Sequence, residues 1–424
     1  MHTLLFLNPA HFHAALTLRE RHALVNEEIF VYATPGPELD AFLALVNAFN
    51  ARPRRPTRWR CKVNAGAEPL RKLIAEGRGD VAVLAGRNRT KMADIRRLRE
   101  AGFHVLADKP WLTGPEGLPH LMAATAGTGP LVMDIMTSRY EVAAIVQRKL
   151  LATPDVFGDL VRDPAGEPAI FMDSVHHLYK TVNGVPLVRP AWYFDIRVQG
   201  DGVVDVPTHL VDLAQWITGG PPVDYDRDVE LLAARRWATS VPPEQFTRIT
   251  EEGAYPEELA PWVRGGTLHY LCNGEFSYRL RGIPIRVRSV WDLEAPPGGG
   301  DASCAVLRGT RADVVLEQGP HTGFEARLCI QPRAGANDVT AALEQAVACW
   351  QGELPGLSVA PDGERLYLKV PSALRSSHEE HFARVLDEFL GYLERGAWPP
   401  QLAPNLRGKY TLLARASQLA RQGE

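Results

Sequence analysis

Short hydrophobic runs alternate with amphipathic segments over the first 150 residues of the chain. The runs predict strands at 3–7, 29–32, 81–85, 104–107 and 131–136. Between them, hydrophobic residues recur three and four positions apart, which predicts helices at 39–49, 91–101 and 141–151. Strands that alternate with helices are typical of a doubly wound parallel sheet. We therefore expect residues 1–150 to form a doubly wound α/β domain on a parallel sheet.

From residue 160 onward, the pattern changes to hydrophobic stretches of strand length that are separated by turns. It predicts strands at 191–198, 267–271, 275–280, 283–291, 302–307 and 312–316. Asn273-Gly274 and Arg281-Gly282 are sequences that join antiparallel neighbours in tight turns. Helical periodicity returns at 381–393 and 409–419. We expect residues 151–424 to form a substrate and oligomerisation domain around an open, mainly antiparallel sheet, with C-terminal helices that pack back on the first domain.

Composition excludes several classes of function. A hydrophobic fraction of 45%, a charged fraction of 23% and a net charge of -3 describe a globular protein without the basic field that binds nucleic acid. The hydrophobic run at the N-terminus stops at Asn8-Pro9, which is too short for a signal sequence or a membrane span. Five scattered cysteines without a C-x-x-C pair are typical of reduced thiols in a cytoplasmic protein.

Polar sequences follow three of the predicted parallel strands, and ligands of such sheets bind at the carboxyl ends of the strands. After the first strand, residues 8–13 read Asn-Pro-Ala-His-Phe-His, where dinucleotide-binding proteins carry G-x-G-x-x-G. Asn8, Ala10 and His13 occupy the three glycine positions, and glycines allow the backbone to approach a pyrophosphate. Taken alone, this loop does not indicate a nucleotide site.

The other two strand ends carry small, amide and charged residues. Gly86 and Asn88 suit a close approach to a flat ring and a hydrogen bond to a ribose, or they form a polar turn at a helix N-terminus. In Asp108-Lys109-Pro110, the proline favours an extended Lys109 whose ammonium projects from the strand end. The alternative is a lysine in a surface salt bridge.

A further group of polar residues lies well downstream. Asp205, His209 and Asp212 are spaced i, i+4 and i+7, which places them on one face of a helix. Pro207 fits only the first helical turn, which makes Asp205 a candidate cap. Two neighbouring carboxylates favour the imidazolium form of His209 and could orient its ring for proton transfer.

Other histidines are weaker candidates. His176 and His177 lie in an apolar run, where histidines with structural partners are common. His11 and His13 could bind a metal with His209 and Asp212 only if the backbone bends, so we expect no metal site. The arginine-rich loop at 50–59 is interpreted as a solvated loop, or as a contact to a cofactor's 2′-phosphate.

Four motifs, in this order, resemble those of the Gfo/Idh/MocA oxidoreductases, related to glucose-fructose oxidoreductase and inositol dehydrogenase. The family's Thr-Pro-Asn is similar to 86–88, its Glu-Lys-Pro to 108–110, its Arg-Tyr pair to 139–140, and its Asp-x-Gly-x-His-x-x-Asp to 205–212, with proline at the glycine. The first loop and the C-terminal segment resemble a poorly characterised branch of the family whose first loop also lacks the glycines.

The resemblance implies that residues 1–150 form a Rossmann-type, dinucleotide-binding domain with a site for NAD or NADP, and that the substrate is a polyol. Cofactor contacts would come from Asn8, Ala10, His11, Phe12, Gly86, Asn88, Asp108 and Lys109. Lys109 would lie between nicotinamide and substrate, His209 would be the acid or base, and Asp205 would orient it. Substrate contacts would come from Tyr140, His176, His177, Asp195 and Asp212.

The function expected from this resemblance is an NAD(P)-dependent oxidoreductase. Its substrate would be a secondary alcohol or ketone of a sugar, cyclitol or glycoside-like polyol. One alternative is a glycosidase that uses NAD without net redox change, and another is a Rossmann-like binding or regulatory protein. We expect a homo-oligomer, a dimer or tetramer, with neither nucleic acid nor membrane as a partner.

Overall fold

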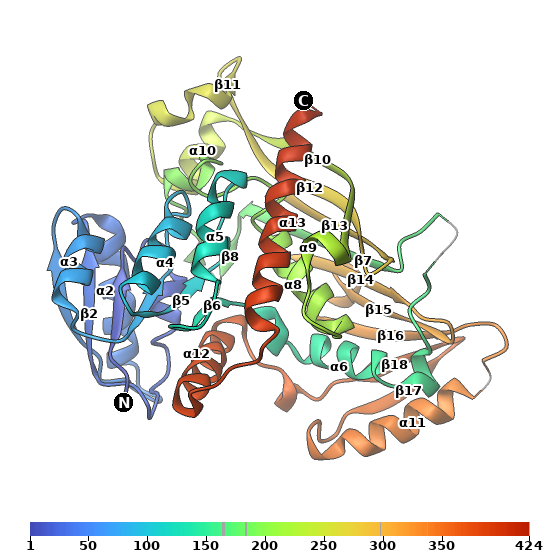
Figure 1. Ribbon diagram of the computed structural model, residues 1–424. Coiled ribbons are helices and arrows are strands. Elements are labelled where there is room, and N and C mark those ends of the chain that lie inside the picture. Colours follow the sequence, from blue (N-terminus) through green and yellow to red (C-terminus); the bar gives the residue numbers. More distant parts are fainter. Residues whose placement is uncertain (163–165, 183–184, 297, 337, 424) are drawn as a thin grey trace. The chain divides into compact units, whose positions relative to one another are not determined.

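The computed structural model describes residues 1–162, 166–182, 185–296, 298–336 and 338–423. The chain divides into two compact units, whose helices and strands are labelled in Figure 1. Unit 1 consists of Met1–Tyr140, Pro221–Val223 and Ser377–Thr411. Unit 2 consists of Glu141–Gly220, Asp224–Ser376 and Leu412–Glu424. Each unit has its own sheet and is described on its own.

Unit 1 is built on a six-stranded parallel sheet in the order β3-β2-β1-β4-β5-β6. The strands are β1 (Leu4–Leu7), β2 (Glu28–Ala33), β3 (Arg60–Ala65), β4 (Val81–Leu84), β5 (His104–Asp108) and β6 (Val132–Ile135). Every residue of β1, β4 and β6 is buried, as in sheets that are covered on both faces. This strand order confirms the predicted Rossmann-type sheet.

Helices from both ends of the chain cover this sheet. They are α1 (His13–Leu16), α2 (Pro37–Ala51), α3 (Pro69–Glu76), α4 (Lys91–Glu100), α5 (Leu118–Ala124), the 3-10 turns η1 (Pro115–Gly117) and η2 (Thr137–Tyr140), α12 (His378–Arg395), and α13 (Leu402–Gln422) as far as Thr411. Ser377 and Glu380 form a capping box at the start of α12, and Gly396 ends it at φ 60°. Phe382 and Phe389 of α12 share the buried core with β1 and β2.

The hydrophobic pattern located the strands and helices predicted within residues 1–151 to within two residues, whereas α12 and α13 begin three and seven residues before the predicted helices. Gly102, at φ 94°, follows α4 as expected for the end of a helix. The pattern did not locate α3, α5 or β3. Because β3 lies at the edge of the sheet and exposes most of its side chains, its sequence lacks a hydrophobic run.

The arginine-rich loop connects α2 to β3 and therefore lies at the amino end of the parallel strands. Asn50 holds it, since its Oδ1 accepts hydrogen bonds from Thr57 Oγ1 at 2.7 Å and from Trp59 N at 2.9 Å. Ligands of such a sheet bind at the opposite, carboxyl edge. The interpretation of these arginines as contacts to a 2′-phosphate is therefore wrong.

Unit 2 contains a ten-stranded sheet in the order β10-β12-β13-β7-β14-β15-β16-β18-β17, with β11 paired to β12. The strands are β7 (Ile170–Tyr179), β10 (Val229–Val241), β11 (Val263–Arg264), β12 (Thr267–Leu280), β13 (Ile283–Glu294), β14 (Ala302–Arg308), β15 (Ala312–Gln318), β16 (Arg327–Pro332), β17 (Ser358–Asp362) and β18 (Arg365–Lys369). Strands β7 and β13 pair in parallel, and the other described pairs are antiparallel. The expected open, mainly antiparallel sheet is confirmed.

Shorter elements complete unit 2. Its helices are α6 (Val142–Leu151), α7 (Pro154–Phe157), α8 (Pro207–Thr218), α9 (Tyr225–Asp228), α10 (Pro243–Thr250) and α11 (Val339–Cys349). Its 3-10 turns are η3 (Ala191–Phe194), η4 (Glu257–Trp262), η5 (Pro320–Thr322), η6 (Trp350–Gly352) and η7 (Ser372–Leu374). Strands β8 (Thr181–Val182) and β9 (Val185–Pro186) pair with each other.

Two predictions for unit 2 need correction. The segments 267–271 and 275–280 form one strand, β12, and Asn273-Gly274 lies inside it. The Asn273 amide donates to Trp237 O at 3.1 Å and to Thr239 Oγ1 at 2.9 Å, where the pairing with β10 shifts register. Asn273 therefore stabilises an irregularity in the sheet instead of a turn. The predicted turn at Arg281-Gly282 is present, with φ 51° and 79°.

The predicted strand at 191–198 is also wrong. Its first half is the 3-10 turn η3, which begins after Pro190 at φ -65°. Tyr193 and Phe194 are both buried although they are adjacent in the chain. Aromatic residues favour strands in general, but here their packing into the core determines the local backbone.

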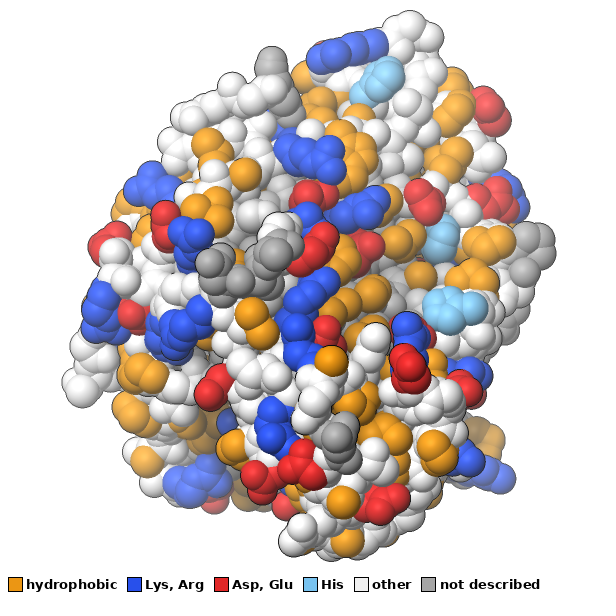
Figure 2. All heavy atoms as spheres, turned by 90° about the vertical axis from the view of Figure 1, so that its right-hand side faces the viewer, with side chains coloured by type: hydrophobic (Ala, Val, Ile, Leu, Met, Phe, Trp, Pro, Cys, Tyr) orange, Lys and Arg blue, Asp and Glu red, His pale blue; other side chains and the backbone are white. Residues whose placement is uncertain are grey.

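The charge of the surface and the hydrophobicity of the helices concern two predicted properties, which are the lack of a nucleic-acid partner and the lack of a membrane partner. Figure 2 shows one face of the molecule, on which Lys and Arg side chains lie among Asp and Glu side chains. None of the helices in the described part of the chain combines the length and hydrophobicity that crossing a membrane requires.

Candidate active site

The carboxyl edge of the parallel sheet brings three polar segments of unit 1 to neighbouring strands. β1, β4 and β5 lie side by side in the sheet. They are followed by the segments 8–12, 86–88 and 108–109, respectively. This edge is where doubly wound sheets bind their ligands.

Two backbone amides of the loop after β1 already donate hydrogen bonds to another part of the protein. Ala10 N and His11 N donate to Ala85 O at 3.1 and 3.2 Å. Asn8, at φ 42°, accepts a hydrogen bond from Thr34 N at 3.1 Å through its side chain. The helix that follows, α1, has only four residues. In a glycine fingerprint, by contrast, loop amides and the start of a longer helix face the pyrophosphate.

Gly86 allows the loops after β1 and β4 to approach each other. A Cβ atom at Gly86 would lie 2.7 Å from Asn8 O and 3.1 Å from Ala10 N, so a larger residue would push the loops apart. This packing accounts for the glycine. Contact of Gly86 and of the 40% exposed Phe12 with a cofactor stays a prediction.

Two histidines of the first loop approach the carboxylate of Asp108. His13 Nδ1 lies 2.9 Å from Asp108 Oδ2, and His11 Nδ1 lies 3.6 Å from the same atom. Burial alone would raise the pKa of the Asp108 carboxyl, but His13, Lys91 and His11 together hold it well below its usual range. Burial and the neighbouring His13 lower the pKa of His11. Near neutral pH, Asp108 is therefore ionised and His11 is neutral.

A buried lysine that the sequence did not indicate supports this cluster. Lys91 Nζ donates to Asn88 Oδ1 and, at 2.9 Å, to the backbone carbonyl of Asp108. Lys91 and Asn88 are 2% and 3% exposed. In the sequence, the only feature that could have connected Lys91 with this cluster was its position three residues after Asn88. Lys91, the first residue of α4, thus ties Asn88 and this helix to the end of β5, and the contact of Asn88 with a ribose stays a prediction.

Lys109 is half-buried at the end of β5. Burial, His13 and His381 lower the pKa of His378 to about 3, and the nearby charge of Lys109 adds to the shift. Lys109 also contributes to the lowered pKa of His11. The ammonium therefore lies among histidines of the first loop and of α12, and sequence reasoning missed the α12 histidines as neighbours.

The segment after Lys109 is anchored by aromatic stacking and a buried ion pair. Trp111 stacks on Tyr410 with ring centroids 5.1 Å apart, and its Nε1 donates to Ala107 O at 3.1 Å. The Tyr410 hydroxyl and Lys409 Nζ donate to Asp134 Oδ2 at 2.9 and 2.6 Å. Fixed neighbours on both sides hold the strand end that carries Lys109 in place.

In unit 2, the second predicted group lies at the start of α8. Pro207 is the first residue of this helix, as predicted, but Val206 is the N-cap and no side chain caps the helix. Asp205 therefore does not cap α8. Asp205 and Asp212 are 4% and 1% exposed, whereas His209, in the first turn, is half-buried.

The buried Asp205 influences two tyrosines of the unit 2 core. Burial is the main cause that raises the pKa of Tyr193 and Tyr270, and the charge of Asp205 adds to both shifts. The Tyr270 hydroxyl donates to Tyr193 O at 2.9 Å. Asp205 thus lies in a dry environment, where an ionised carboxylate acts strongly on its neighbours.

His176 and His177 of β7 approach a carboxylate that the sequence did not indicate. Their Nδ1 atoms lie 3.1 and 3.6 Å from oxygens of Asp301, and Lys180 Nζ donates to Asp301 at 2.6 Å. Burial alone would raise the pKa of Asp301, but His176 and Lys180 hold it well below its usual range. This arrangement favours a structural role for the two histidines, and their contact with substrate stays a prediction.

Tyr140 and Asp195 have partners in their own units. The Tyr140 hydroxyl donates to Glu388 of α12 within unit 1. Asp195 accepts hydrogen bonds from Arg197 within unit 2, the shortest at 2.7 Å from Nη2. Neither side chain shows a feature that would mark it as a substrate contact, so both stay predictions.

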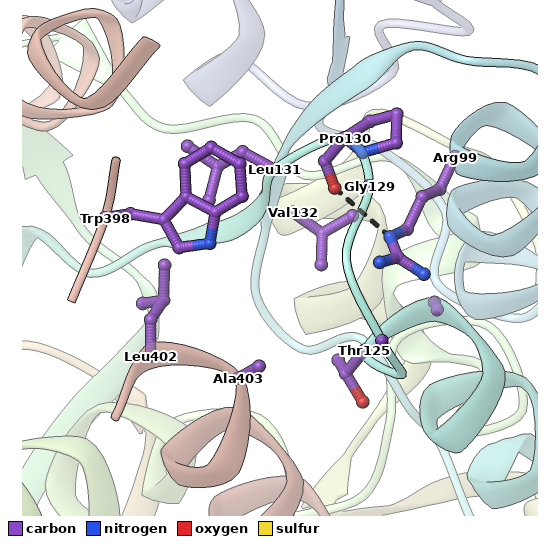
Figure 3. Close-up of a pocket in the computed structure, with 11 residues that line it drawn as sticks. Arg99, Thr125, Gly129, Pro130, Leu131, Val132, Trp398, Leu402 and Ala403 are labelled. Carbon is purple, nitrogen blue, oxygen red and sulfur yellow. Dashed lines mark hydrogen bonds between the residues drawn. The ribbon is translucent and has the colours of Figure 1, made fainter. Parts of the chain in front are cut away.

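Unit 1 also contains a small pocket at the amino end of β6 (Figure 3). Trp398 and Leu402 line it, and Arg99 donates to Pro130 O beside it at 3.1 Å. Its volume of about 40 Å³ has room for water but not for a sugar or a dinucleotide. Since it lies at the edge opposite Lys109, it is not a candidate for the active site.

Comparison with known proteins assigns the chain to a family. Residues 146–421 match the family described as "Putative oxidoreductase C terminal domain". The chain belongs to this oxidoreductase family. None of the curated proteins matches it.

Solved structures share the fold of the oxidoreductase. A structure described as a "putative oxidoreductase" from Parabacteroides merdae ATCC 43184 is 35% identical, with a TM-score of 0.96 over 100% of this chain and 98% of that one. Levoglucosan dehydrogenase in complex with NADH and levoglucosan is 14% identical, with a TM-score of 0.62 over 100% and 97%. A "putative myo-inositol dehydrogenase" from Sinorhizobium meliloti 1021 is 13% identical, with a TM-score of 0.56 over 100% and 98%. The fold is that of the Gfo/Idh/MocA oxidoreductases.

The oxidoreductase carries one cluster of predicted site residues in each unit. In unit 1, the fold brings His11, Asn88, Asp108 and Lys109 to one edge of the sheet. In unit 2, Asp205, His209 and Asp212 lie in and before one helix. The roles assigned to these residues are proposals.

Proposed function

We propose that this protein is a nicotinamide-dependent dehydrogenase or reductase. Its proposed substrate is a secondary alcohol or ketone of a sugar, cyclitol or glycoside-like polyol. The observation that carries the proposal is the half-buried Lys109 beside the ionised Asp108 at the carboxyl edge of a Rossmann-type sheet. Levoglucosan dehydrogenase, which shares the fold, was crystallised with NADH and levoglucosan, and this supports the classes of cofactor and substrate.

The residues at this edge fit the nicotinamide ring and its ribose better than they fit the pyrophosphate of a dinucleotide. Lys109 and the segment 86–88 offer the charge and the small residues that suit a nicotinamide ring and its ribose. The amides of Ala10 and His11 already donate to Ala85 O, so a pyrophosphate would depend on other groups. We therefore propose that NAD or NADP is contacted by Asn8, Ala10, His11, Phe12, Gly86, Asn88, Asp108 and Lys109, with less help from loop amides than a glycine fingerprint gives.

In the proposed reaction, two side chains have separate catalytic roles. Oxidation of a secondary alcohol breaks a C–H and an O–H bond and forms the carbonyl. When bound at this edge, an oxidised nicotinamide would supply the hydride acceptor. We assign the hydroxyl proton to His209, because an imidazole that titrates near neutral pH suits general base catalysis. The ammonium of Lys109 stabilises the negative charge that develops on the oxygen, and the buried Asp205 orients His209.

Cofactor binding tests the proposal first. Purified protein is denatured and the supernatant is analysed for nicotinamide, and isothermal calorimetry then measures binding of NAD, NADH, NADP and NADPH. Retained nicotinamide or saturable binding of one of these forms is expected. If no form binds and none is retained, the redox function is wrong and a Rossmann-like binding protein remains.

Turnover on a panel of sugars and cyclitols tests the two side chains. Lys109→Met and His209→Asn should each lower kcat by about a hundredfold or more, because each removes a group that acts mainly in the transition state. His209→Asn should also flatten the pH profile near neutrality. Lys62→Met and His321→Asn are matched controls, since these side chains are 58% and 65% exposed. Full activity in both site variants would contradict the assigned roles.

A further inference from the structure

Three potential metal ligands converge at the carboxyl edge of the unit 1 sheet. His11 comes from the loop after β1, His13 is the first residue of α1, and Asp108 is the last residue of β5. One ring nitrogen of each histidine and one carboxylate oxygen of Asp108 all lie within 4.8 Å of one another. Sequence reasoning considered the same two histidines with His209 and Asp212, and did not consider Asp108 as their third partner.

The separations suit a small cation. The two histidine nitrogens lie 2.9 and 3.6 Å from Asp108 Oδ2. Ligands of a tetrahedral zinc ion, at roughly 2.0–2.2 Å from the metal, lie about 3.3 Å from one another. Relative to Asp108 Oδ2, each of these two nitrogens needs to move by only a few tenths of an ångström to reach this separation.

The hydrogen bonds of the cluster leave one buried polar atom unsatisfied. His13 Nδ1 is hydrogen-bonded to Asp108, whereas His11 Nδ1 is buried and has no hydrogen-bond partner among the described residues. An unsatisfied buried polar atom costs about 1–3 kcal/mol. A cation that all three atoms coordinate removes this cost without any change of backbone.

The charges around the cluster are the remaining constraint on a metal. Two ammonium groups lie nearby and oppose a cation. Lys91 Nζ, however, is bonded to Asn88 Oδ1 and to the backbone carbonyl of Asp108, so it does not occupy the carboxylate oxygen that faces the histidines. Lys109 is only half-buried, so solvent screens part of its repulsion.

We propose that His11, His13 and Asp108 bind a divalent transition-metal ion such as zinc. Two imidazoles and one carboxylate are the ligand set of open zinc sites and of the facial triad of non-haem iron. Three protein ligands leave a further position for water or for an oxygen atom of a ligand, beside Lys109. The ion also fixes the first loop through side chains, where other Rossmann-type proteins use glycine.

Metal content tests the proposal independently of any nicotinamide. Protein without a polyhistidine tag is stripped with a chelator, incubated with zinc sulfate and desalted, and zinc is measured by mass spectrometry. About one zinc ion per chain is expected for the wild type and for His321→Ala, whose side chain is 65% exposed. His11→Ala, His13→Ala and Asp108→Asn should each weaken binding by at least about tenfold.

Cobalt(II) provides a readout that does not depend on the variants folding. In the wild type, cobalt should give the intense visible absorption of a four- or five-coordinate nitrogen and oxygen site, and zinc should remove it. Circular dichroism establishes that each variant is folded, and His11→Ala is the mildest, because His11 Nδ1 makes no hydrogen bond. The proposal is overturned if the wild type retains no zinc and gives only the weak spectrum of hydrated cobalt, or if the double variant His11→Ala, His13→Ala binds zinc as tightly as the wild type. Either result leaves the nicotinamide-binding test of the proposed function unaffected.

Discussion

Individual carboxylates in this protein are contacted by several nitrogen-bearing side chains at once. Asp301 in unit 2 illustrates this, since Lys180 Nζ lies 2.6 Å and His176 Nδ1 lies 3.1 Å from its Oδ2. The Asp301 side chain is 27% exposed, so solvent screens these contacts only in part. The held carboxylate joins the region around residue 301 to β7, and it makes the stability of unit 2 depend on pH.

Asp301→Asn should therefore destabilise the protein at neutral pH more than at acidic pH. The folded-state pKa of Asp301 lies below its unfolded value, so its contribution is complete above an unfolded pKa of about 3.9. The contribution is lost as the pH falls through that value towards the folded pKa. Urea unfolding of the wild type and the variant, followed from pH 7 to pH 3, should show two midpoints that converge. A constant difference across this range would show that Asp301 is not held as an ion.

At the scale of elements, the segment before α8 lies directly against the backbone of β12. A Cβ atom at Gly202 would come within 2.2 Å of the carbonyl carbon of Asn273, and one at Gly274 would come within 2.4 Å of Gly202 O. Gly202 N also donates to Leu271 O at 3.0 Å. This backbone contact determines where α8 begins, and so it positions Asp205, which precedes the helix.

Gly202→Ala should separate the two backbones and shift the start of α8. We expect the free energy of unfolding to fall by about 1–3 kcal/mol, as in other overpacked sites, and kcat to fall because Asp205 and His209 move. Chemical denaturation and turnover measure the two effects. Gly253→Ala is the control in the same unit, since nothing lies within 4 Å of a Cβ atom there. A Gly202→Ala variant as stable and active as this control would contradict the argument.

Elements with a continuous hydrophobic signal could be predicted, and elements whose order depends on distant partners could not. The buried strands β1, β4 and β6 follow directly from their sequences, whereas the edge strand β3 does not, because its side chains are mostly exposed. Asn273-Gly274 has the sequence of a turn, but contacts with β10 keep it inside a strand.

The candidate site shows the same division. Lys109 and Asn88 could be found because each directly follows a hydrophobic strand. His378 could not be connected with them, because it lies far away in the sequence and only the packing of α12 on the parallel sheet brings it close to His13. Asp301 escaped notice for the same reason, since its partners His176 and Lys180 belong to a remote segment.

At the scale of the whole chain, α13 is one helix that contributes to both units. Lys409 and Tyr410 bind Asp134 in unit 1, and further along the helix the Ser417 hydroxyl donates to Asp201 Oδ2 at 2.7 Å in unit 2. The boundary between the units lies at Thr411. We therefore expect the two units to unfold together as long as this helix is continuous.

Thr411→Pro should uncouple the two units. Proline inside a helix removes a backbone hydrogen bond and costs about 3 kcal/mol. Differential scanning calorimetry should show one transition for the wild type and two for Thr411→Pro. Thr411→Ala keeps the helix and should unfold like the wild type, although it removes the same buried hydroxyl group. A single transition in the proline variant would show that the units are coupled by other means.

The division of unit 1 between the two ends of the chain affects its synthesis. Phe382, Leu386 and Phe389 of α12 belong to the same buried core as the strands at the N-terminus. When residue 140 leaves the ribosome, the sheet has its strands but lacks this cover, and all of residues 141–376 must still be translated. The nascent chain therefore exposes a hydrophobic surface for most of translation, and chaperones that bind such surfaces have a long interval in which to act on it.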